Sequence, residues 1–185
     1  MPLSAPDFEH LITDRLRLRL PAERDAAELL ALYGDPQVMR QWRHAPWRAW
    51  RQALDEVAEA RADLAAGRAL HLVLVTHRDA RLAGSCALFD IHPQHRRATL
   101  GYLLASAYWR QGLGREAVQA LLEHGFDALG LERVEAEVDP RNGASRALLR
   151  RLGFHCEGLL RARWQVGGQA RDVELWALLR RDWPA

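Results

Sequence analysis

Hydrophobic and polar residues alternate in several short segments of the chain. Between Arg15 and Leu20, arginine alternates with leucine, so that Leu16, Leu18 and Leu20 share one face. A period of two is typical of a strand with one buried face. This pattern, or a short apolar run between turn residues, predicts about seven strands, at 11–20, 70–76, 82–91, 98–104, 133–138, 157–166 and 172–179.

Four other segments have the residue spacing of helices. The clearest covers 112–129, where Ala117, Val118, Leu121 and Phe126 lie on one face. The helix expected at 144–152 ends at a glycine, as helices often do. The predicted helices are 26–33, 47–66, 112–129 and 144–152.

The order of these elements predicts a mixed α/β fold in one domain, residues 1–185. The helix at 112–129 is long enough to cross the sheet and make the strands before and after it parallel. A chain of 185 residues, 49% of them hydrophobic and 27% charged, is sufficient for one sizeable core.

Composition argues against several classes of protein. No apolar run approaches the roughly 18 residues of a membrane helix, and the polar segment 1–10 has no signal-peptide pattern. Cys86 and Cys156 suggest neither a disulfide framework nor a zinc site, so we expect a cytoplasmic protein without a metal. A net charge of +2, with no block of like charge, gives no reason to expect a nucleic acid or a membrane as partner.

The segment 102–117 predicts a binding site for phosphate groups. A strand ends there, and a loop with Gly112 and Gly114 leads into a helix whose first N–H groups and dipole attract anions. Glycine lets a backbone approach a pyrophosphate, and Arg110 and Arg115 would add charged contacts. All 26 basic residues are arginine, whose planar fork suits phosphate. An ordinary helix start would look similar, and neither a P-loop nor a dinucleotide fingerprint is present.

A second informative segment, 138–154, joins a predicted strand to the next helix. Asn142 precedes that helix and is either its N-cap or a group that binds a ligand. Ser145 falls in the first turn and is either a solvent-facing hydroxyl or a reacting group. The sequence leaves both alternatives open.

Together these segments resemble the GNAT superfamily of acetyltransferases, and in particular its RimJ/RimL-type branch of protein N-terminal acetyltransferases. The similarity covers nearly the whole chain and is most specific from Asn-Gly-Ala-Ser to Leu-Gly-Phe, 142–154. It includes Thr-Asp-Arg-Leu-Arg-Leu-Arg at 13–19 and Leu-Gly-Tyr at 100–102. Trp109 occupies the first position of the superfamily's Gln/Arg-x-x-Gly-x-Gly/Ala pattern, as it does in this branch.

The resemblance implies a GNAT fold: a mixed, mostly antiparallel sheet of about seven strands, splayed between the fourth and fifth, with about four helices. It implies acetyl-CoA as acyl donor and direct attack by an amine in a ternary complex. The expected acceptor is a protein or peptide N-terminal α-amine. The alternatives are a polyamine, amino acid or antibiotic amine, or a weakly catalytic CoA-binding module. A homodimer is compatible with this branch, although no residue specifies one.

The resemblance also implies roles for individual residues. Backbone groups of Leu103, Leu104 and Ala105 would pair with the pantetheine arm, and the N–H near Leu103 would stabilise the oxyanion. Asn142 would bind the pantetheine region, and Ser145 would protonate the leaving thiolate. The pyrophosphate would lie on the loop amides of Arg110, Gln111, Gly112, Leu113, Gly114 and Arg115.

Thr99 stands where many relatives carry a glutamate that acts as general base. A threonine hydroxyl does not take up a proton near neutral pH. An α-amine with a pKa near 7.8 is roughly one-tenth neutral at pH 7, whereas a lysine amine near 10.4 is only about 0.04% neutral. This favours an α-amine, or another amine of low pKa, over a lysine side chain as acceptor. Other candidate bases, each more readily explained as a solvated or core residue, are His44, His71, Asp90, Glu135, Glu137 and Glu174.

Tryptophan is concentrated in the segment that covers the acceptor cleft in this superfamily. Trp42, Trp47 and Trp50 gather there with His44. They predict either an aromatic wall that selects the acceptor or a cluster that packs this segment onto the sheet. The sequence does not distinguish these two roles.

Overall fold

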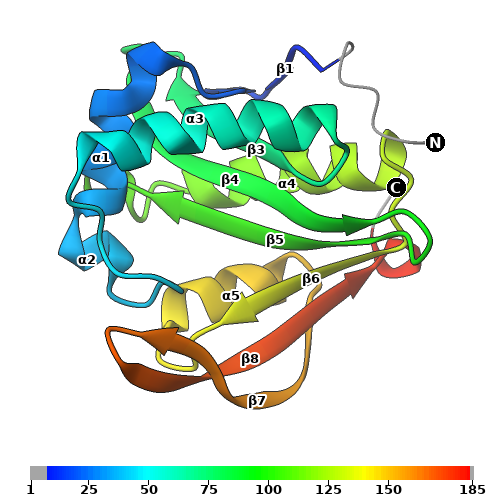
Figure 1. Cartoon of the computed structure of the whole chain (residues 1–185). Helices are drawn as coiled ribbons and strands as arrows, with labels where there is room; N and C mark the ends of the chain where they lie inside the picture. The colour runs from blue at the N-terminus through cyan, green and yellow to red at the C-terminus, as the bar shows by residue number, and fades with distance from the viewer. Residues whose placement is uncertain (1–7, 184–185) are drawn as a thin grey trace.

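The structure, a computed structural model, describes residues 8–183. Its strands are β1 His10–Ile12, β2 Leu16–Arg19, β3 Leu70–Thr76, β4 Leu82–His92, β5 Arg97–Leu104, β6 Arg133–Val138, β7 His155–Val166 and β8 Gln169–Leu179. Within the described range they form one 8-stranded sheet in the order β1-β2-β3-β4-β5-β6-β8-β7 (Figure 1). β5 and β6 are parallel, and the other neighbours are antiparallel. The predicted mixed, mostly antiparallel sheet is confirmed.

The predicted strand at 11–20 is in fact two strands joined by a tight turn. The N–H of Thr13 donates to the carbonyl of Leu16 at 2.9 Å, and the N–H of Leu16 donates to the Thr13 hydroxyl at 2.9 Å. β1 and β2 therefore pair with each other. Alternation continues on both sides of such a turn, so a period of two does not reveal where the chain reverses.

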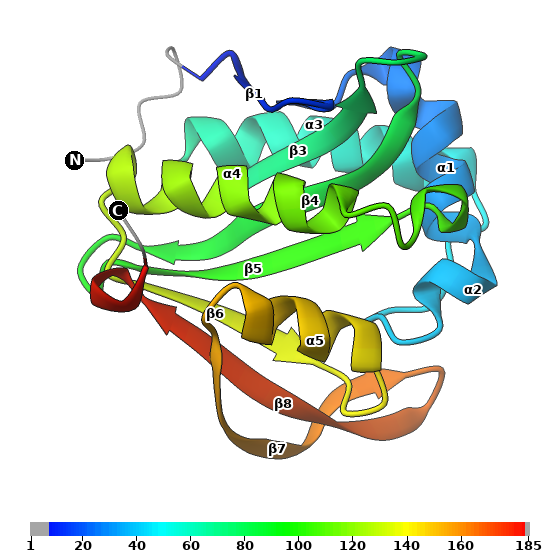
Figure 2. The same cartoon turned by 180° about the vertical axis from the view of Figure 1, so that it is seen from behind.

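Helices cover both faces of the sheet. In residues 8–183 they are α1 Ala26–Gly34, α2 Pro36–Met39, α3 Trp50–Ala65, α4 Leu113–Asp127 and α5 Gly143–Arg151. α1 and α3 lie on one face, and α4 and α5 lie on the other (Figure 1, Figure 2). None of these helices is long and apolar enough to cross a membrane.

Two helix starts differ from the sequence prediction. Asp35 and Pro36 end α1, as expected, but they also begin α2, because the Asp35 carboxylate accepts the N–H of Gln37 at 2.8 Å and proline suits a first helical position. α3 begins at Trp50 rather than at 47. The Gln52 side chain accepts the N–H groups of residues 48 and 49, which stabilises the extended chain ahead of the helix.

Each face of the sheet buries its own apolar cluster. Leu121, Leu122 and Phe126 of α4 pack against one face, and Leu29 and Val57 of α1 and α3 pack against the other. β5 contributes to both, because alternate side chains of a strand point to opposite faces. Leu100 joins the α4 cluster, and Leu103 joins the α1–α3 cluster.

β5 and β6 are neighbours for only a short distance. Their register covers Arg97–Arg133, Ala98–Val134 and Thr99–Glu135. Beyond Thr99, β5 continues to Leu104 while pairing only with β4. The two strands diverge from this point (Figure 1). The predicted splay in the middle of the sheet is therefore present, with its closed end at Thr99.

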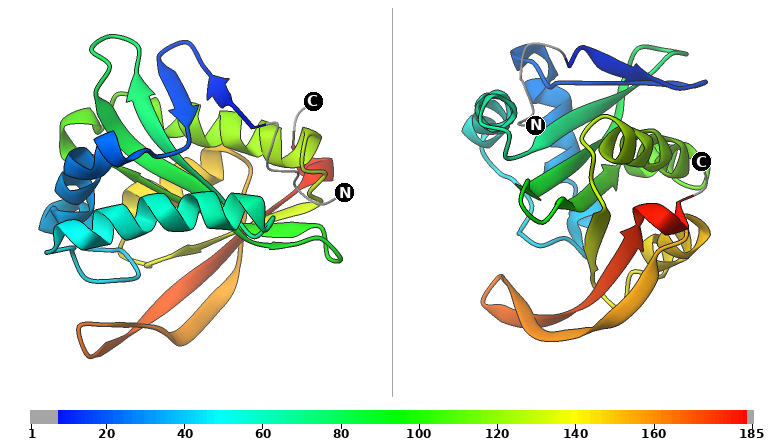
Figure 3. Two further views of the ribbon diagram at one scale, coloured as in Figure 1. Left: turned by 45° about the horizontal axis from the view of Figure 1, so that its top comes forward. Right: turned by 90° about the vertical axis from the view of Figure 1, so that its right-hand side faces the viewer.

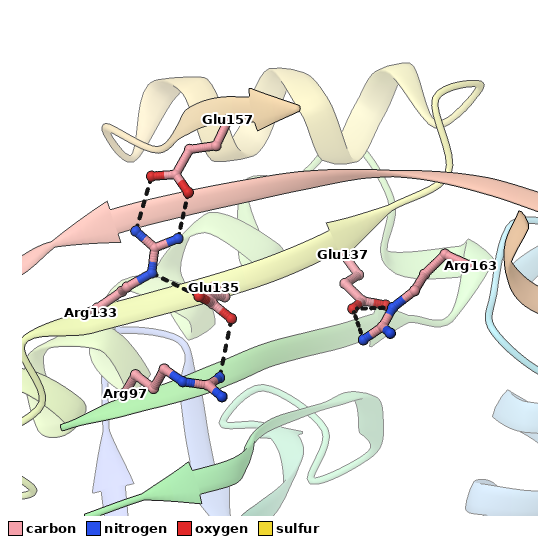
Figure 4. A network of polar contacts seen from close by, with 6 residues as sticks. All are labelled: Arg97, Arg133, Glu135, Glu137, Glu157 and Arg163. Carbon is pink, nitrogen blue, oxygen red and sulfur yellow. Dashed lines mark hydrogen bonds and ion pairs between the residues drawn. The ribbon is translucent and has the colours of Figure 1, made fainter. Parts of the chain in front are cut away.

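Ion pairs stabilise the closed end of this splay. Arg133 contacts Glu135 at 2.7 Å and binds Glu157 of β7 through two nitrogens, and Arg97 of β5 contacts Glu135 at 3.3 Å (Figure 4). These contacts join β5, β6 and β7. Farther along β6, Glu137 accepts from Arg163 of the β7–β8 hairpin, which extends away from the first strands (Figure 3).

We predict that Arg133→Ala destabilises the fold by about 1–2 kcal/mol, between the values for exposed and buried ion pairs, because it leaves Glu135 and Glu157 without their shared partner. Urea denaturation gives the free energy of unfolding. The matched control is Arg161→Ala on β7, an exposed position, where we expect less than about 0.5 kcal/mol. Equal losses in both variants would contradict the role of Arg133.

Candidate active site

The loop after β5 ends in an open helix N-terminus. Gly112 is the N-cap of α4 with φ of +80°, a conformation that suits glycine, and Arg110 also has a positive φ of +62°. The N–H of Glu116 returns to the carbonyl of Gly112 at 3.2 Å. The N–H groups of residues 113–115 precede this bond and lie at the positive end of the helix dipole. The structure thus places the predicted segment 110–115 at an open helix N-terminus, where an anion would be favoured.

The two glycines of this loop have different roles. Gly112 is required by its backbone angle, since a Cβ there would meet only Arg15, at 3.4 Å. Gly114 is buried, and a Cβ there would lie 3.0 Å from Leu104 and 3.5 Å from Leu148. The absence of a side chain at 114 therefore lets α4 pack closely against β5, a different role from the predicted access for pyrophosphate.

A carboxylate in the first turn of α4 fixes the loop, and the sequence analysis missed it. Glu116 accepts from the Thr13 hydroxyl at 2.6 Å and from the backbone N–H and Nε of Arg15 at 2.8 and 2.6 Å. Arg15 also donates to the carbonyl of Gln111 at 2.8 Å. Burial would raise the pKa of Glu116, but the bonds from Thr13 and Arg15 outweigh it and hold that pKa below its usual range. The motif at 13–19 was the available signal, but its partner is about 100 residues away in the chain.

Asn142 and Ser145 lie at the N-terminus of α5. The Asn142 side chain accepts the N–H of Ser145 at 3.0 Å, so Asn142 is the N-cap of this helix. The Ser145 hydroxyl is 2.6 Å from the hydroxyl of Tyr102 on β5. Burial raises the pKa of Tyr102 to about 12, so this phenol is protonated at neutral pH. The pair bridges the open part of the splay, and Tyr102 is a site residue that the sequence prediction had left out.

The backbone groups of β5 point alternately toward β4 and toward the opening. The N–H of Ala105 donates to the carbonyl of Ala83 on β4 at 2.9 Å, and the β4–β5 register is regular from there to Thr99. Alternation in an antiparallel ladder then directs the groups of Leu103 to β4, and those of Tyr102 and Leu104 into the opening. The predicted oxyanion donor, Leu103, is thus on the wrong side, and the predicted role of Ala105 is not supported either.

A cavity lies on the α3 side of the sheet, next to the opening. It is bounded by α1, α3, the segment 42–44 and strands β3 to β5, and it reaches β5 at Gly101 and Tyr102. A Cβ at Gly101 would be 3.2 Å from Phe89 and 3.5 Å from Trp42. Glycine at this position keeps the cavity open toward the point where β5 and β6 separate.

The three predicted tryptophans have separate roles. Trp42 lines the cavity. Trp47 stacks on Tyr33 with 4.2 Å between ring centroids, so it packs this segment onto α1. Trp50 is 52% exposed at the start of α3 and does not line the cavity. Only Trp42 therefore remains a candidate for contact with an acceptor.

His44 stabilises the aromatic segment. Its Nε2 accepts from the indole of Trp42 at 3.1 Å, and its Nδ1 is 2.9 Å from the carbonyl of Ala45. Burial lowers the pKa of His44. Both nitrogens are engaged in the neutral ring, so His44 is poorly placed to accept another proton.

The other predicted bases divide into two groups. The first group does not line the cavity. In it, Glu135, Glu137 and Glu174 are paired with arginines, and Glu137 and Glu174 also accept from tryptophan N–H groups. Asp90 is exposed, in an irregular part of β4. Thr99 does not line the cavity either. The second group is His71, which does line it, beside Glu56 of α3.

Comparison with known proteins is consistent with this geometry. The acetyltransferase (GNAT) domain family matches residues 15–155. The uncharacterised N-acetyltransferase p20 of Bacillus licheniformis is 34% identical, over 95% of this chain and 99% of its own. RimJ of Mycobacterium smegmatis, solved with CoA-disulfide, superimposes with a TM-score of 0.84 at 30% identity, covering 92% of this chain and 84% of that one.

Two further relatives have different acceptors in their names. The ribosomal protein uS5-alanine N-acetyltransferase of Escherichia coli is 28% identical, over 94% of this chain and 92% of its own. The spermidine N(1)-acetyltransferase of the same organism is also 28% identical, over 85% and 82%. The predicted similarity to the RimJ/RimL-type branch is confirmed, and the chain belongs to the GNAT family of acetyltransferases, as an N-acetyltransferase.

Proposed function

We propose that this enzyme transfers the acetyl group of acetyl-CoA to the α-amine of a protein or peptide N-terminus. The observation that carries the choice of acceptor is Thr99 at the closed end of the splay, where β5 itself carries a hydroxyl and the neighbouring carboxylate, Glu135, is held by Arg97 and Arg133. An α-amine is already partly neutral at pH 7. The relative that modifies ribosomal protein uS5 supports the same acceptor class.

The proposed donor site combines the two halves described above. The N–H groups of the loop at Arg110, Gln111, Gly112, Leu113, Gly114 and Arg115 would hold the pyrophosphate. The pantetheine arm would follow the free edge of β5 at Tyr102 and Leu104, close to Asn142. The carbonyl of Leu104 already accepts from the indole of Trp109 at 2.8 Å, so a ligand would pair there with the Leu104 N–H or with the second lone pair of this carbonyl. RimJ, which shares this fold, was solved with a CoA derivative.

The proposed reaction is direct attack of the amine on the thioester carbonyl. The nitrogen–carbon bond forms while the negative charge on the oxygen is stabilised by a backbone N–H of β5 that faces the opening, at Tyr102 or Leu104. The carbon–sulfur bond then breaks. The hydroxyl pair of Tyr102 and Ser145 supplies a proton to the leaving thiolate and is reprotonated from solvent, while the nitrogen releases its own proton toward solvent.

A polyamine is the second candidate acceptor, because a spermidine acetyltransferase is among the relatives. A polyamine carries several positive charges and needs several carboxylates to bind. Among the described residues, the cavity is lined by one carboxylate, Glu56, and by the guanidinium of Arg43, which lies over the ring of Phe89 at 4.6 Å. This balance of charge favours an acceptor with a single amine.

We predict that Glu116→Ala weakens acetyl-CoA binding about 10-fold, a cost of about 1.4 kcal/mol, because the loop loses its contacts to Thr13 and Arg15. Titration calorimetry measures the affinity. The control is Glu123→Ala, an exposed residue on the same helix, for which we expect no change. Failure of the wild type to bind acetyl-CoA would reject the donor site as a whole.

We predict that Tyr102→Phe lowers kcat by about 10² or more, the usual contribution of a positioned proton donor, while acetyl-CoA affinity stays within about threefold. The Ser145 hydroxyl loses its partner in this variant. Steady-state kinetics with a peptide acceptor test this, with Tyr108→Phe as control. Equal kcat in the wild type and Tyr102→Phe would remove Tyr102 from the mechanism.

We predict faster acetylation of free peptide N-termini than of lysine side chains or spermidine at pH 7. The neutral fraction of an α-amine exceeds that of lysine by roughly 300-fold at this pH. A panel of free peptides, N-blocked lysine peptides and spermidine measures kcat/KM for each acceptor class. A higher kcat/KM for spermidine than for the free peptides would favour a polyamine as acceptor and overturn the proposed one.

A further inference from the structure

A row of three ionisable side chains links the cavity to the surface. His71 of β3 lies between two carboxylates of α3, with Nδ1 at 3.4 Å from Glu56 and Nε2 at 3.5 Å from Asp63. The positions 56 and 63 are two helical turns apart, so they lie on the same side of the helix. All three side chains are partly buried, with 22–26% of their surface exposed.

One end of this row lies at the cavity and the other end lies near the solvent. Glu56 and His71 line the cavity, together with Gly101 and Tyr102 of β5, whereas Asp63 does not. Asp63 instead accepts from the exposed guanidinium of Arg68, at 3.0 and 2.7 Å. The carboxylate of Glu56 is therefore at the cavity end, and Asp63 is at the solvent end.

The other polar groups of the cavity already have partners. Arg43 lies over the ring of Phe89. The hydroxyl of Tyr33 is 2.8 Å from that of Ser85, and burial raises the pKa of Tyr33 beyond the neutral range. His44 is engaged on both ring nitrogens. Glu56 is thus the carboxylate that an amine entering this cavity would meet.

We propose that Glu56 accepts the proton of the attacking amine and that His71 relays it toward Asp63 and solvent. This inference rests on the proposed function. As the nitrogen–carbon bond forms, the nitrogen becomes cationic, and its proton moves to the Glu56 carboxylate. Glu56 passes a proton to His71, and release to water restores the starting state. The carbon–sulfur bond breaks, the thiolate takes its proton from the Tyr102–Ser145 pair, and solvent returns a proton to that pair.

This assignment accounts for the residue at position 99. Side chains at odd positions of β5 point to the α1–α3 face, as Leu103 does. A glutamate at 99 would therefore extend toward the same face as the cavity. Glu56 reaches that face from α3, so the proton acceptor is supplied by a helix instead of by the strand.

The decisive experiment compares Glu56→Gln with Glu59→Gln, an exposed glutamate one turn farther along α3. With the amine that the wild type acetylates best, we expect Glu56→Gln to lower kcat about 100-fold or more at pH 7, as for loss of a general base. Glu59→Gln should match the wild type. Acetyl-CoA affinity and thermal unfolding should be unchanged in both, which shows that the fold and the donor site are intact.

Two further variants distinguish a role of Glu56 as general base from a role only in binding the acceptor amine. Glu56→Ala should be inactive alone and regain kcat with added formate, which can enter the space left by the side chain. His71→Gln should lower kcat less than Glu56→Gln does. A rise in KM with unchanged kcat in Glu56→Gln, or no effect of formate, would overturn the proposal. A wild type that acetylates no amine would instead reject the proposed function, so the two failures are distinguishable.

Discussion

The limited pairing of β5 and β6 determines the geometry of the candidate site. The two strands share register only as far as Thr99 and Glu135. Beyond that point each strand keeps its outer neighbour, so the backbone groups of Tyr102 and the N–H of Leu104 on the inner edge of β5 have no strand partner. Unpaired backbone groups in a sheet interior are costly unless a partner satisfies them. An extended ligand that pairs with this edge, as proposed for the pantetheine arm, would provide the partner.

Ion pairs stabilise the closed end of this opening, and contacts of Glu116 stabilise its open end. At the closed end, Arg133 joins Glu135 to Glu157 and thus β6 to β7. At the open end, Glu116 fixes the start of α4 to the β1–β2 turn through Thr13 and Arg15. The β1–β2 hairpin is distant in sequence from the residues of the proposed reaction. Its contacts with Glu116 nevertheless set the position of the loop that would bind the pyrophosphate.

The sequence predicted the architecture well because the patterns that specify it are local. Period-two segments, helical spacing and the loop with Gly112 are all visible within short windows. The predictions failed where the answer depended on contacts between distant segments. The strand at 11–20 reverses at Thr13 without a break in the alternation, and Glu116 finds its partners about 100 residues away.

Register explains the errors at the site itself. Leu103 was assigned an oxyanion role from the resemblance to the GNAT superfamily, but the direction of a backbone N–H depends on pairing with β4, which only the structure shows. The same holds for the tryptophans. Composition gathered Trp42, Trp47 and Trp50 into one cluster, whereas packing places Trp42 alone at the cavity.

The two proton transfers of the proposed reaction are separated by the sheet. Tyr102 turns toward α5, where it meets Ser145, and its neighbour Gly101 opens to the cavity on the α3 side. A thioester held in the gap beyond Thr99 would be protonated at sulfur from one face and attacked by the amine from the other. This separation would place the proton donor for sulfur and the proton acceptor for nitrogen on opposite sides of the thioester. With this arrangement, a proton acceptor on α3 could replace one on β5 without affecting the proton donor. Both acceptor positions lie on the α1–α3 face of the sheet, whereas Ser145 of the donor pair belongs to α5.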